Sequence, residues 1–259
     1  MEHSISTEVN SAENAVAFPP VDIVVVAHNP DEWFGDVLNS FAIQDYPDFN
    51  VVVLTTGEER QMRHFVHEYL PQAQVQAVES DHGYGRNLNS VLDLETDSAF
   101  FLFCHHDVAL APDALRLMVE ESLRSNAGIV GPKIVNWDRP DELLDIGYSV
   151  DKLGFLVSRV EPGELDQEQH DSVSDVFMVS STVVLVRADL FQALSGFDEE
   201  IGMVGEDLDL CWRAHLAGAR VLIVPLALAR HREERGKYRT DGEEEKHRER
   251  HRLRVVLSS

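Results

Sequence analysis

Three side chains that could bind a metal, His105, His106 and Asp107, follow the apolar residues 100–103 and Cys104. A short apolar run that is stopped by polar residues predicts a buried central strand. Ligands of open α/β sheets lie beyond the carboxyl ends of such strands, which is where these three side chains would stand. Burying them costs free energy unless something pairs with them. The stretch therefore fits a divalent-metal site, or else a solvated loop that contains two histidines.

Polar or glycine-containing turns also follow the three preceding strands of a strand–helix repeat. Apolar runs predict strands at residues 21–27, 51–54 and 74–78, and helical periodicity predicts helices at residues 31–44, 58–70, 86–94 and 112–124. This alternation predicts a mostly parallel sheet with helices on both faces. One edge would then collect His28-Asn29, Thr55-Thr56-Gly57, the turn at residues 81–85 and the cluster at residues 105–107. Four such segments predict a cleft that is large enough for a nucleotide.

The second half of the chain is predicted to be less regular. Short strands are expected at residues 128–132 and 133–135, a long excursion beside the sheet at 136–175, and a strand at 175–186. A short helix at 188–194, a longer helix at 205–218 and a last strand at 220–225 follow. Acids crowd the start of the longer helix, where the helix dipole favours negative charge. Asp209 and Arg213, four residues apart on it, predict a surface ion pair.

Composition restricts the partners and the compartment. The formal charge is −24, and residues 1–229 contain 12 basic and 39 acidic residues, which gives that part a charge of −27. A body this acidic would repel nucleic acid. Residues 1–17 lack the features of a signal peptide, and no apolar run approaches the ~20 residues of a membrane span. Cys104 and Cys211 lie within apolar patterns, so they predict buried thiols in a reducing compartment.

Five segments, in this order, resemble the family 2 glycosyltransferases with the GT-A fold, over residues 21–231. They are the opening strand with Ala27-His28-Asn29, then Gly83-Tyr84-Gly85-Arg86-Asn87, then His105-His106-Asp107-Val108 in the place of the family's D-x-D, then Gly196-Phe197-Asp198-Glu199 with Gly205-Glu206-Asp207-Leu208, and finally Val224-Pro225 with His231. The resemblance implies an α/β GT-A fold, with a Rossmann-like, mostly parallel central sheet, helices on both faces and a smaller acceptor-side subregion. It divides the chain into a disordered segment (1–20), a nucleotide-binding half (21–126), an acceptor half (127–231) and a charged tail (232–259).

The resemblance also implies an activity. This is an inverting, metal-dependent transfer of a sugar from a nucleoside-diphosphate sugar to a hydroxyl of a glycan or lipid-linked acceptor, as in the synthesis of bacterial cell-surface polysaccharides. Asp207 matches the general base of the family, and Glu206 would hold the acceptor or orient Asp207. Mn²⁺ or Mg²⁺ would be ligated by Asp107, His231 and His105. The residues that would contact the nucleotide are Ala27, His28, Asn29, Thr55, Gly83, Arg86, Asn87, His106 and Asp107.

Two positions depart from the family pattern. His105 replaces the first aspartate of D-x-D, and an imidazole would favour manganese over magnesium, unless Asp107 binds the metal alone and His105 touches phosphate or sugar. His106 should point the other way, because neighbours in an extended segment alternate. Thr55-Thr56 stands where the family usually has an aspartate near the nucleobase. The identity of the base is therefore left open, as are the sugar and the acceptor.

Two other functions fit parts of the pattern. A non-catalytic nucleotide-sugar-binding or scaffold module would account for His105, but it would not need the retained set Asp107, Glu206, Asp207 and His231. A sugar nucleotidyltransferase would open with a glycine-rich loop and a basic residue, and Ala27-His28-Asn29-Pro30 has neither. The sequence leaves the oligomeric state open, a homodimer included.

Basic residues in the tail have two expected uses. The nearer set, which could fold over a diphosphate, is Arg232, Arg235, Lys237 and Arg239. The farther set, which could attract anionic lipid before the apolar Val255-Val256-Leu257, is Arg248, Arg250, Arg252 and Arg254. The second use predicts a cytoplasmic protein at the inner face of the cell membrane. A solvated helix of mixed charge fits equally, because seven acids are interleaved from residue 230 onward.

Overall fold

The computed structural model describes residues 18–29, 31–78, 83–94, 96–152, 155–201 and 205–233. These residues form a ten-stranded sheet. Its strands are β1 (Val21–Ala27), β2 (Phe49–Thr55), β3 (Gln74–Ala77), β4 (Phe100–His105), β5 (Val108–Leu110), β6 (Ala127–Asn136), β7 (Leu143–Asp145), β10 (Ser174–Asp175), β11 (Val183–Arg187) and β12 (Arg220–His231). A separate two-stranded sheet pairs β8 (Tyr148–Val150) with β9 (Leu156–Ser158).

The strands of the large sheet run in the order β10-β12-β6-β11-β4-β1-β2-β3, with β5 added to β12 and β7 added to β6. The β4-β1-β2-β3 half is parallel, as the alternation of strands and helices predicted. Strand β11 lies antiparallel between β4 and β6, so it joins the two predicted halves of the chain into one sheet. The sheet is therefore mixed, and the prediction of an α/β fold with a mostly parallel central sheet is confirmed.

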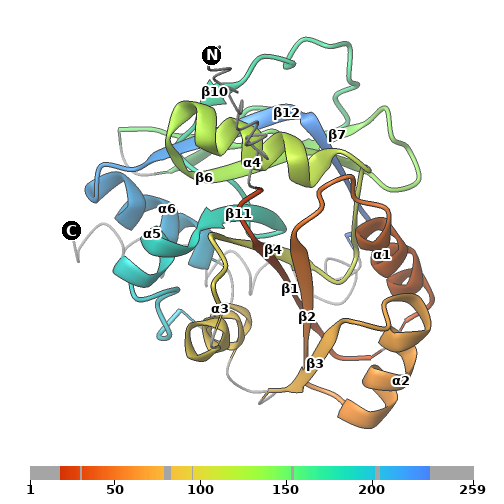
Figure 1. Cartoon of the computed structure of the whole chain (residues 1–259). Coiled ribbons are helices and arrows are strands. Elements are labelled where there is room, and N and C mark those ends of the chain that lie inside the picture. The colour runs from red at the N-terminus through yellow and green to blue at the C-terminus, as the bar shows by residue number, and fades with distance from the viewer. Residues whose placement is uncertain are drawn as a thin grey trace, which may run out of the picture.

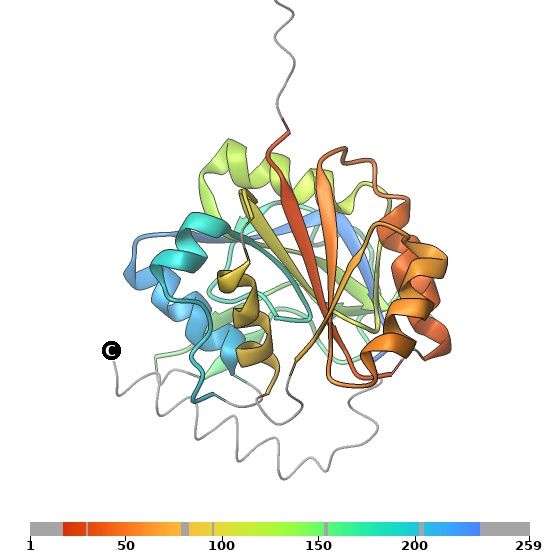
Figure 2. The same ribbon diagram turned by 60° about the horizontal axis from the view of Figure 1, so that its bottom comes forward.

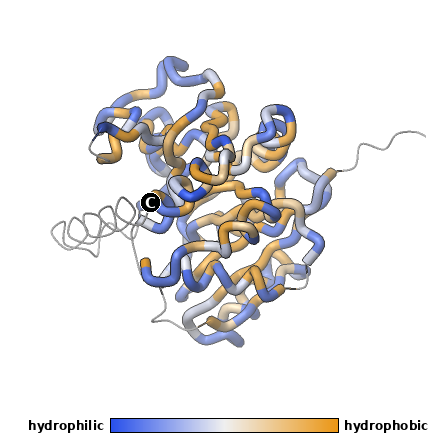
Figure 3. The backbone as a smooth tube through the Cα atoms, turned by 90° about the vertical axis from the view of Figure 1, so that its left-hand side faces the viewer, coloured by the Kyte–Doolittle hydropathy of each residue, from blue (hydrophilic) through white to orange (hydrophobic). Residues whose placement is uncertain are grey.

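Helices cover both faces of this sheet, as predicted (Figures 1 and 2). On one face lie α1 (Glu32–Ala42), α2 (Glu59–Tyr69) and α4 (Ala114–Ser125), and on the other lie α3 (Tyr84–Leu88), α5 (Ala188–Ala193) and α6 (Glu206–Leu216). Alternate residues of β1 serve the two faces, with Ile23 and Val25 in one apolar cluster and Val24 and Val26 in the other. Figure 3 shows the apolar stretches gathered in the interior.

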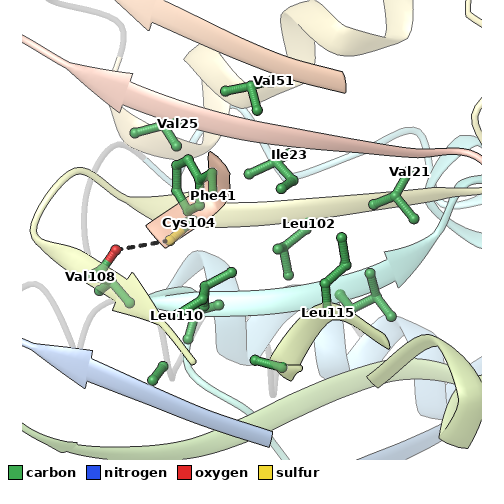
Figure 4. Packing of buried hydrophobic residues seen from close by; sticks show 14 of the residues in the cluster. Val21, Ile23, Val25, Phe41, Val51, Leu102, Cys104, Val108, Leu110 and Leu115 are labelled. Carbon is green, nitrogen blue, oxygen red and sulfur yellow. Dashed lines mark hydrogen bonds between the residues drawn. The ribbon is translucent and has the colours of Figure 1, made fainter. Parts of the chain in front are cut away.

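The predicted burial of both cysteines is confirmed. Cys104 is fully buried on β4 and points toward the carbonyl oxygen of Val108, among Phe41, Leu102 and Leu110 (Figure 4). Cys211, a residue of α6, is buried on the other side of the sheet. Burial raises the pKa of both thiols, that of Cys211 to about 12, so both are inert apolar packing residues at neutral pH.

Three predicted elements have different bounds in the structure. The strand expected at 175–186 is confirmed only at its ends: Asp175 belongs to β10, and β11 begins at Val183, because the preceding Ser180 and Thr182 side chains bond each other and the local backbone in place of a strand ladder. The two short strands at 128–135 form the single strand β6. The helix expected at 86–94 is α3 followed by a 3₁₀-helix, Asn89–Asp93.

Strand β12 continues past Pro225, where the sequence predicted its end. Proline cannot donate to a ladder, and the pairing of β12 with β6 shifts register between Val224 and Leu228. This irregularity leaves Leu226 exposed and lets the ladder resume from Leu228 to His231. The continuation brings His231 to the same edge of the sheet as the end of β4.

The ends of the described chain bear on two predictions. Residues 18–20 are ordered, against the prediction of disorder through residue 20: the Tyr46 hydroxyl donates to the Pro19 carbonyl oxygen at 2.6 Å, and Ala99 N–H donates to that of Pro20 at 2.8 Å. Residues 1–17 and the tail from 234 onward, with its predicted membrane-binding set, lie outside the described residues. Among the described helices, none combines the length and apolarity that a membrane crossing requires.

The central position of β4 generates a stability prediction. Leu102 is fully buried, whereas Leu216 at the end of α6 is 68% exposed. Leu102→Ala should lower the free energy of unfolding by about 2–5 kcal/mol, because it leaves a cavity in the core. Leu216→Ala, a matched control, should change it by about 0.5 kcal/mol or less. Urea denaturation measures both, and equal losses would contradict the described packing.

Candidate active site

Three side chains from two distant parts of the chain converge at the carboxyl end of β4. One ligand atom from each of His105, Asp107 and His231 lies within 4.8 Å of the other two. Nε2 of His231 and Oδ2 of Asp107 are 3.4 Å apart, and the rings of His105 and His231 have centroids 6.0 Å apart. Asp107 is fully buried, and both histidines are partly exposed. The group therefore has the composition and spacing of a divalent-metal site that is open on one side.

The pairing of β5 with β12 produces this convergence. His231 is the register partner of Val108, and Arg232 N–H donates to the carbonyl oxygen of Asp107 at 3.1 Å. On the other side, His105 N–H donates to the Thr182 carbonyl oxygen at 2.9 Å. Both sides of the 105–107 turn are thus held by backbone hydrogen bonds, which fix the direction of its side chains.

The histidines determine the charge of Asp107. Burial alone would raise the pKa of this carboxyl group, but the hydrogen bond and positive charge of His231, with the charges of His105 and His106, outweigh burial and hold the pKa well below its usual range. Asp107 is therefore a carboxylate at any pH at which the protein would work, which is the form that binds a cation.

Two acids stand at the start of α6. Glu206 is 6% exposed, and its Oε1 accepts a hydrogen bond from the Ser181 hydroxyl at 3.0 Å. Asp207 accepts from Leu208 N–H at 2.8 Å and from Ser181 N–H at 3.4 Å. Burial, and then the charge of Glu206, raise the pKa of Asp207 to about 7. A carboxyl group with this pKa can accept a proton near neutral pH and is a suitable general base.

A third acid, Asp145 at the end of β7, was not predicted from the sequence. It is 8% exposed and accepts a hydrogen bond from Gly147 N–H at 2.6 Å. Burial raises its pKa to about 6, and the charge of Asp207 adds to this shift while that of His231 opposes it. Asp145 therefore lies within electrostatic reach of both Asp207 and His231. Its position in an excursion without periodicity left no signal in the sequence.

The first two nucleotide segments meet at the ends of β1 and β2. The carbonyl oxygen of buried Ala27 accepts from Thr56 N–H at 3.2 Å, and Nδ1 of exposed His28 is 2.9 Å from the Thr56 hydroxyl. A Cβ on Gly57 would lie 2.0 Å from the His28 carbonyl oxygen, so this junction needs glycine. The exposed surface here consists of His28, Asn29 and part of Thr56.

Thr55 differs from the prediction. Its side chain is fully buried and accepts a hydrogen bond from Gly57 N–H at 3.1 Å. It therefore holds the turn, and the neighbouring Thr56 is the threonine that is partly exposed.

The glycine turn lies beside the acid pair. Gly83 accepts from Asn87 N–H at 3.2 Å, and Asn87 itself is buried. A Cβ on Gly85 would lie 3.0 Å from the Cβ of Phe197 and 3.4 Å from that of Glu206. Arg86 forms an ion pair of 3.5 Å with Glu199. The turn predicted to bind nucleotide thus also contacts the predicted acceptor region.

Three further expectations concern neighbouring side chains. His106 does point away from His105: its ring lies 6.4 Å from that of Phe34 on α1, whereas the ring of His105 lies 4.8 Å from that of Tyr84 on α3. Arg232, of the nearer basic set, places its guanidinium over the ring of Trp33 at 5.2 Å. The other members of that set lie outside the described residues.

The ion pair of Asp209 and Arg213 forms, but it is not the predicted surface pair. Asp209 is 7% exposed, and Arg213 also donates to the carbonyl oxygens of Leu194 and Gly196 at 2.8 and 2.9 Å. It therefore holds the turn before Phe197 against α6. A helical spacing of four residues predicts the pair but cannot show what packs over it.

Comparisons with known proteins identify relatives of this chain. The rhamnosyltransferase WbbL of Escherichia coli (strain K12) is 24% identical over 224 residues, which are 82% of this chain and 83% of the relative. The O-antigen biosynthesis protein RfbC of Myxococcus xanthus is 24% identical over 213 residues, 79% of this chain and 16% of the relative. The pre-mycofactocin glycosyltransferase of Mycobacterium tuberculosis (strain H37Rv) is 30% identical over 134 residues, which are 51% of this chain and 26% of the relative. The chain thus spans under a third of the length of these last two relatives.

Solved structures share the fold. The crystal structure of GalNAc-T7 with UDP, GalNAc and Mn²⁺ has a TM-score of 0.68 at 12% identity, over 87% of this chain and 44% of that one. The structure of S. aureus TarS 1-349 in complex with UDP has a TM-score of 0.64 at 18% identity, over 93% of this chain and 66% of that one. The model of the family described as glycosyltransferase like family 2 matches residues 19–255. The chain therefore belongs to glycosyltransferase family 2 and has the GT-A fold, as its motifs predicted.

Proposed function

We propose that this protein transfers a sugar from a nucleoside-diphosphate sugar to a hydroxyl of a glycan or lipid-linked acceptor, with inversion at the anomeric carbon. One observation carries the proposal: His105, Asp107 and His231 converge at the carboxyl end of β4, and the same edge carries a buried acid pair in which Asp207 has a pKa of about 7. A site for a cation and a base for a hydroxyl are the two parts that this reaction needs.

The metal-binding residues suit a divalent ion. Two imidazoles and a carboxylate form a mixed nitrogen and oxygen set, which favours Mn²⁺ over Mg²⁺. When bound, such an ion would offset the negative charge that develops on the departing diphosphate. Asp107 would be the anionic ligand, and the two partly exposed histidines would complete the protein's share of the site.

The acid pair suits the acceptor side of the reaction. Asp207 would accept the proton of the acceptor hydroxyl as the oxygen attacks the anomeric carbon. Glu206 keeps the pKa of Asp207 raised through its charge, so the protonated product of this step is stable near pH 7. Direct attack from the face opposite the diphosphate inverts the configuration, and no second carboxylate is needed as a nucleophile.

The nucleotide would lie over the ends of β1 and β2. His28, Asn29 and Thr56 are exposed or partly exposed there, and Arg232 lies near the metal-binding residues. Because UDP occupies two solved structures with this fold, uracil is the first base to test. The match to a rhamnosyltransferase over most of both chains supports a cell-surface polysaccharide as the product.

Free, buried thiols support a cytoplasmic location, and membrane contact would fall to the tail.

A non-catalytic nucleotide-sugar-binding module remains the second candidate, since His105 replaces the first aspartate of the metal motif. Burial raises the pKa of Asp207 and of Asp145, and the charge of a neighbouring acid adds to each shift, so this arrangement costs stability that a scaffold would have no reason to give up. A screen of UDP-, dTDP- and GDP-sugars with Mn²⁺ tests the two candidates. Release of nucleoside diphosphate supports the transferase, and tight binding without release over hours supports the module.

Loss of a metal ligand should abolish the metal dependence of nucleotide binding. Asp107→Asn should lower the affinity for UDP in the presence of Mn²⁺ by more than about tenfold and remove the difference between buffers with and without Mn²⁺. His231→Ala should have a smaller effect in the same direction. Calorimetry measures both, with His64→Ala as a control because that side chain is 84% exposed. An undiminished Mn²⁺ effect in Asp107→Asn would contradict the assignment.

Loss of the base should leave donor binding intact. Asp207→Asn should reduce kcat by about 10²- to 10⁴-fold, because the acceptor proton has no acceptor group, while the donor Kd stays within about threefold. Asp36→Asn, on the exposed face of α1, is the matched control. Product analysis by NMR should show inversion. Retention of more than a tenth of the activity in Asp207→Asn would assign the proton transfer to another group, with Glu206 as the first to examine.

The pH dependence follows from the same carboxyl group. A general base works when ionised, and the pKa of Asp207 is about 7, so kcat/KM should rise from pH 5.5 to pH 8 with a midpoint near 7. An ordinary aspartate, with a pKa near 4, would leave the rate flat over this range. Initial rates at saturating Mn²⁺ distinguish the two profiles.

A further inference from the structure

A three-residue segment, Ser180-Ser181-Thr182, links the metal-binding residues to the acid pair. The backbone N–H of Ser181 donates to Asp207 Oδ2 at 3.4 Å, and its hydroxyl donates to Glu206 Oε1 at 3.0 Å. The next carbonyl oxygen, that of Thr182, accepts from His105 N–H at 2.9 Å. Ser181 is 5% exposed, so water does not compete for these hydrogen bonds.

Tyr84 closes the same connection from the opposite side. Its hydroxyl donates to the Ser181 carbonyl oxygen at 3.4 Å, and its ring packs edge-on against that of His105 with centroids 4.8 Å apart. The following residue, Gly85, lies against the Cβ of Glu206. Ser181 thus uses its N–H, carbonyl and hydroxyl groups at once, and each leads to a residue of the candidate site or to its direct neighbour.

We propose that Ser181 is a positioning residue. It holds Glu206, the ionised acid, and Asp207, the proton acceptor, in a fixed position relative to His105. The role in catalysis rests on the proposed function, in which Asp207 is the base. The hydrogen bonds themselves do not depend on that function, and neither does their effect on the protonation of the two acids.

The hydroxyl of Ser181 is the decisive group. Glu206 is buried, and among the described residues no donor reaches its other oxygen, Oε2. Removal of the hydroxyl would leave a buried carboxylate with no side-chain donor to either oxygen, which favours its neutral form. A neutral Glu206 no longer repels a charge on Asp207. The Ser181 hydroxyl therefore sustains the raised pKa of Asp207 without touching its side chain.

The other charged groups around Asp207 do not change in this argument. Asp145, on β7, faces it with a charge of the same sign, and Asp145 in turn interacts with His231. Cys211, on α6 itself, is neutral because burial raises its pKa to about 12. Both remain when Ser181 is altered, so a change in the titration of Asp207 would report the link through Glu206.

The test is a ¹³C NMR titration of the Asp207 carboxyl group in the full chain, without donor or metal, with Asp207→Asn used for assignment. Ser181→Ala should move the midpoint of Asp207 down by about one pH unit, because it removes the repulsion from Glu206. Glu206→Gln should move it in the same direction by at least as much. Ser180→Ala is the matched control, since that hydroxyl bonds Thr182 and neither acid, and it should leave the midpoint unchanged.

Two further variants make the outcome decisive. Ser181→Ala combined with Glu206→Gln should show the midpoint of Glu206→Gln alone, because both changes act through one charge. Ser181→Cys keeps the size of the side chain with a weak donor, and it should also lower the midpoint if Ser181→Ala does not fold. A midpoint that stays within about 0.2 pH units or rises in the folded Ser181 variants overturns the proposal.

Activity separates this proposal from the proposed function. If Asp207 is the base, Ser181→Ala should lower kcat with little change in the donor KM, and its pH–rate profile should shift to lower pH together with the titration. If Asp207→Asn remains active, the proposed base is wrong, but the titrations still test the hydrogen-bonded link. If Asp207→Asn is inactive and the Ser181 variants titrate like the wild type, the positioning role alone fails.

Discussion

The short antiparallel pairing of β5 with the end of β12 is the interaction on which the site depends. It matches His231 with Val108 and leaves Arg232 N–H bonded to the Asp107 carbonyl oxygen. Without this pairing, His231 would lie at an ordinary charged end of a strand, and Asp107 would be a buried carboxylate without a counter-charge. Because the pairing is made by backbone groups, it constrains the distance between the two side chains without requiring any particular residue beside them.

This pairing is possible because β12 tolerates Pro225. The register shift between Val224 and Leu228 absorbs the missing hydrogen bond, and the strand then resumes against both β6 and β5. Leu226 lies within the irregular part and stays exposed. Beyond it, the ladder with β6 extends by four further residues. A strand that ended at the proline would stop before His231 could reach the edge.

Burial of charge is the second constraint on the molecule. Asp107 is stabilised as an anion by three imidazoles, while Asp145 and Asp207 are shifted toward their neutral forms by burial and by other acids. One edge of a sheet thus holds carboxyl groups whose pKa values are shifted in opposite directions, which under the proposed function would separate the binding of a cation from the acceptance of a proton. Two apolar clusters, one on each face, hold the strands that carry these groups.

Local patterns in the sequence were sufficient for the elements that are regular. The buried strands at β1, β2 and β4 and the helices α1, α2, α4 and α6 follow from apolar runs and helical periodicity, because a chain buries its apolar residues with the period of the element it forms. Asp107 was a candidate because it follows an apolar run, His231, Glu206 and Asp207 were candidates through their resemblance to family motifs, and the direction of His106 followed from alternation along the chain.

The tertiary structure decided what depends on partners distant in sequence. Thr55 is buried and Asp209 is packed under Arg213, although both types are usually exposed, because the burial of a side chain depends on what lies over it. Ser181 and Asp145 were missed, since a serine at a predicted strand and an aspartate in an irregular stretch carry no periodic signal. Their importance comes from contacts across 25 or more positions of the chain, as between Ser181 and Glu206, and such contacts exist only once the sheet has formed.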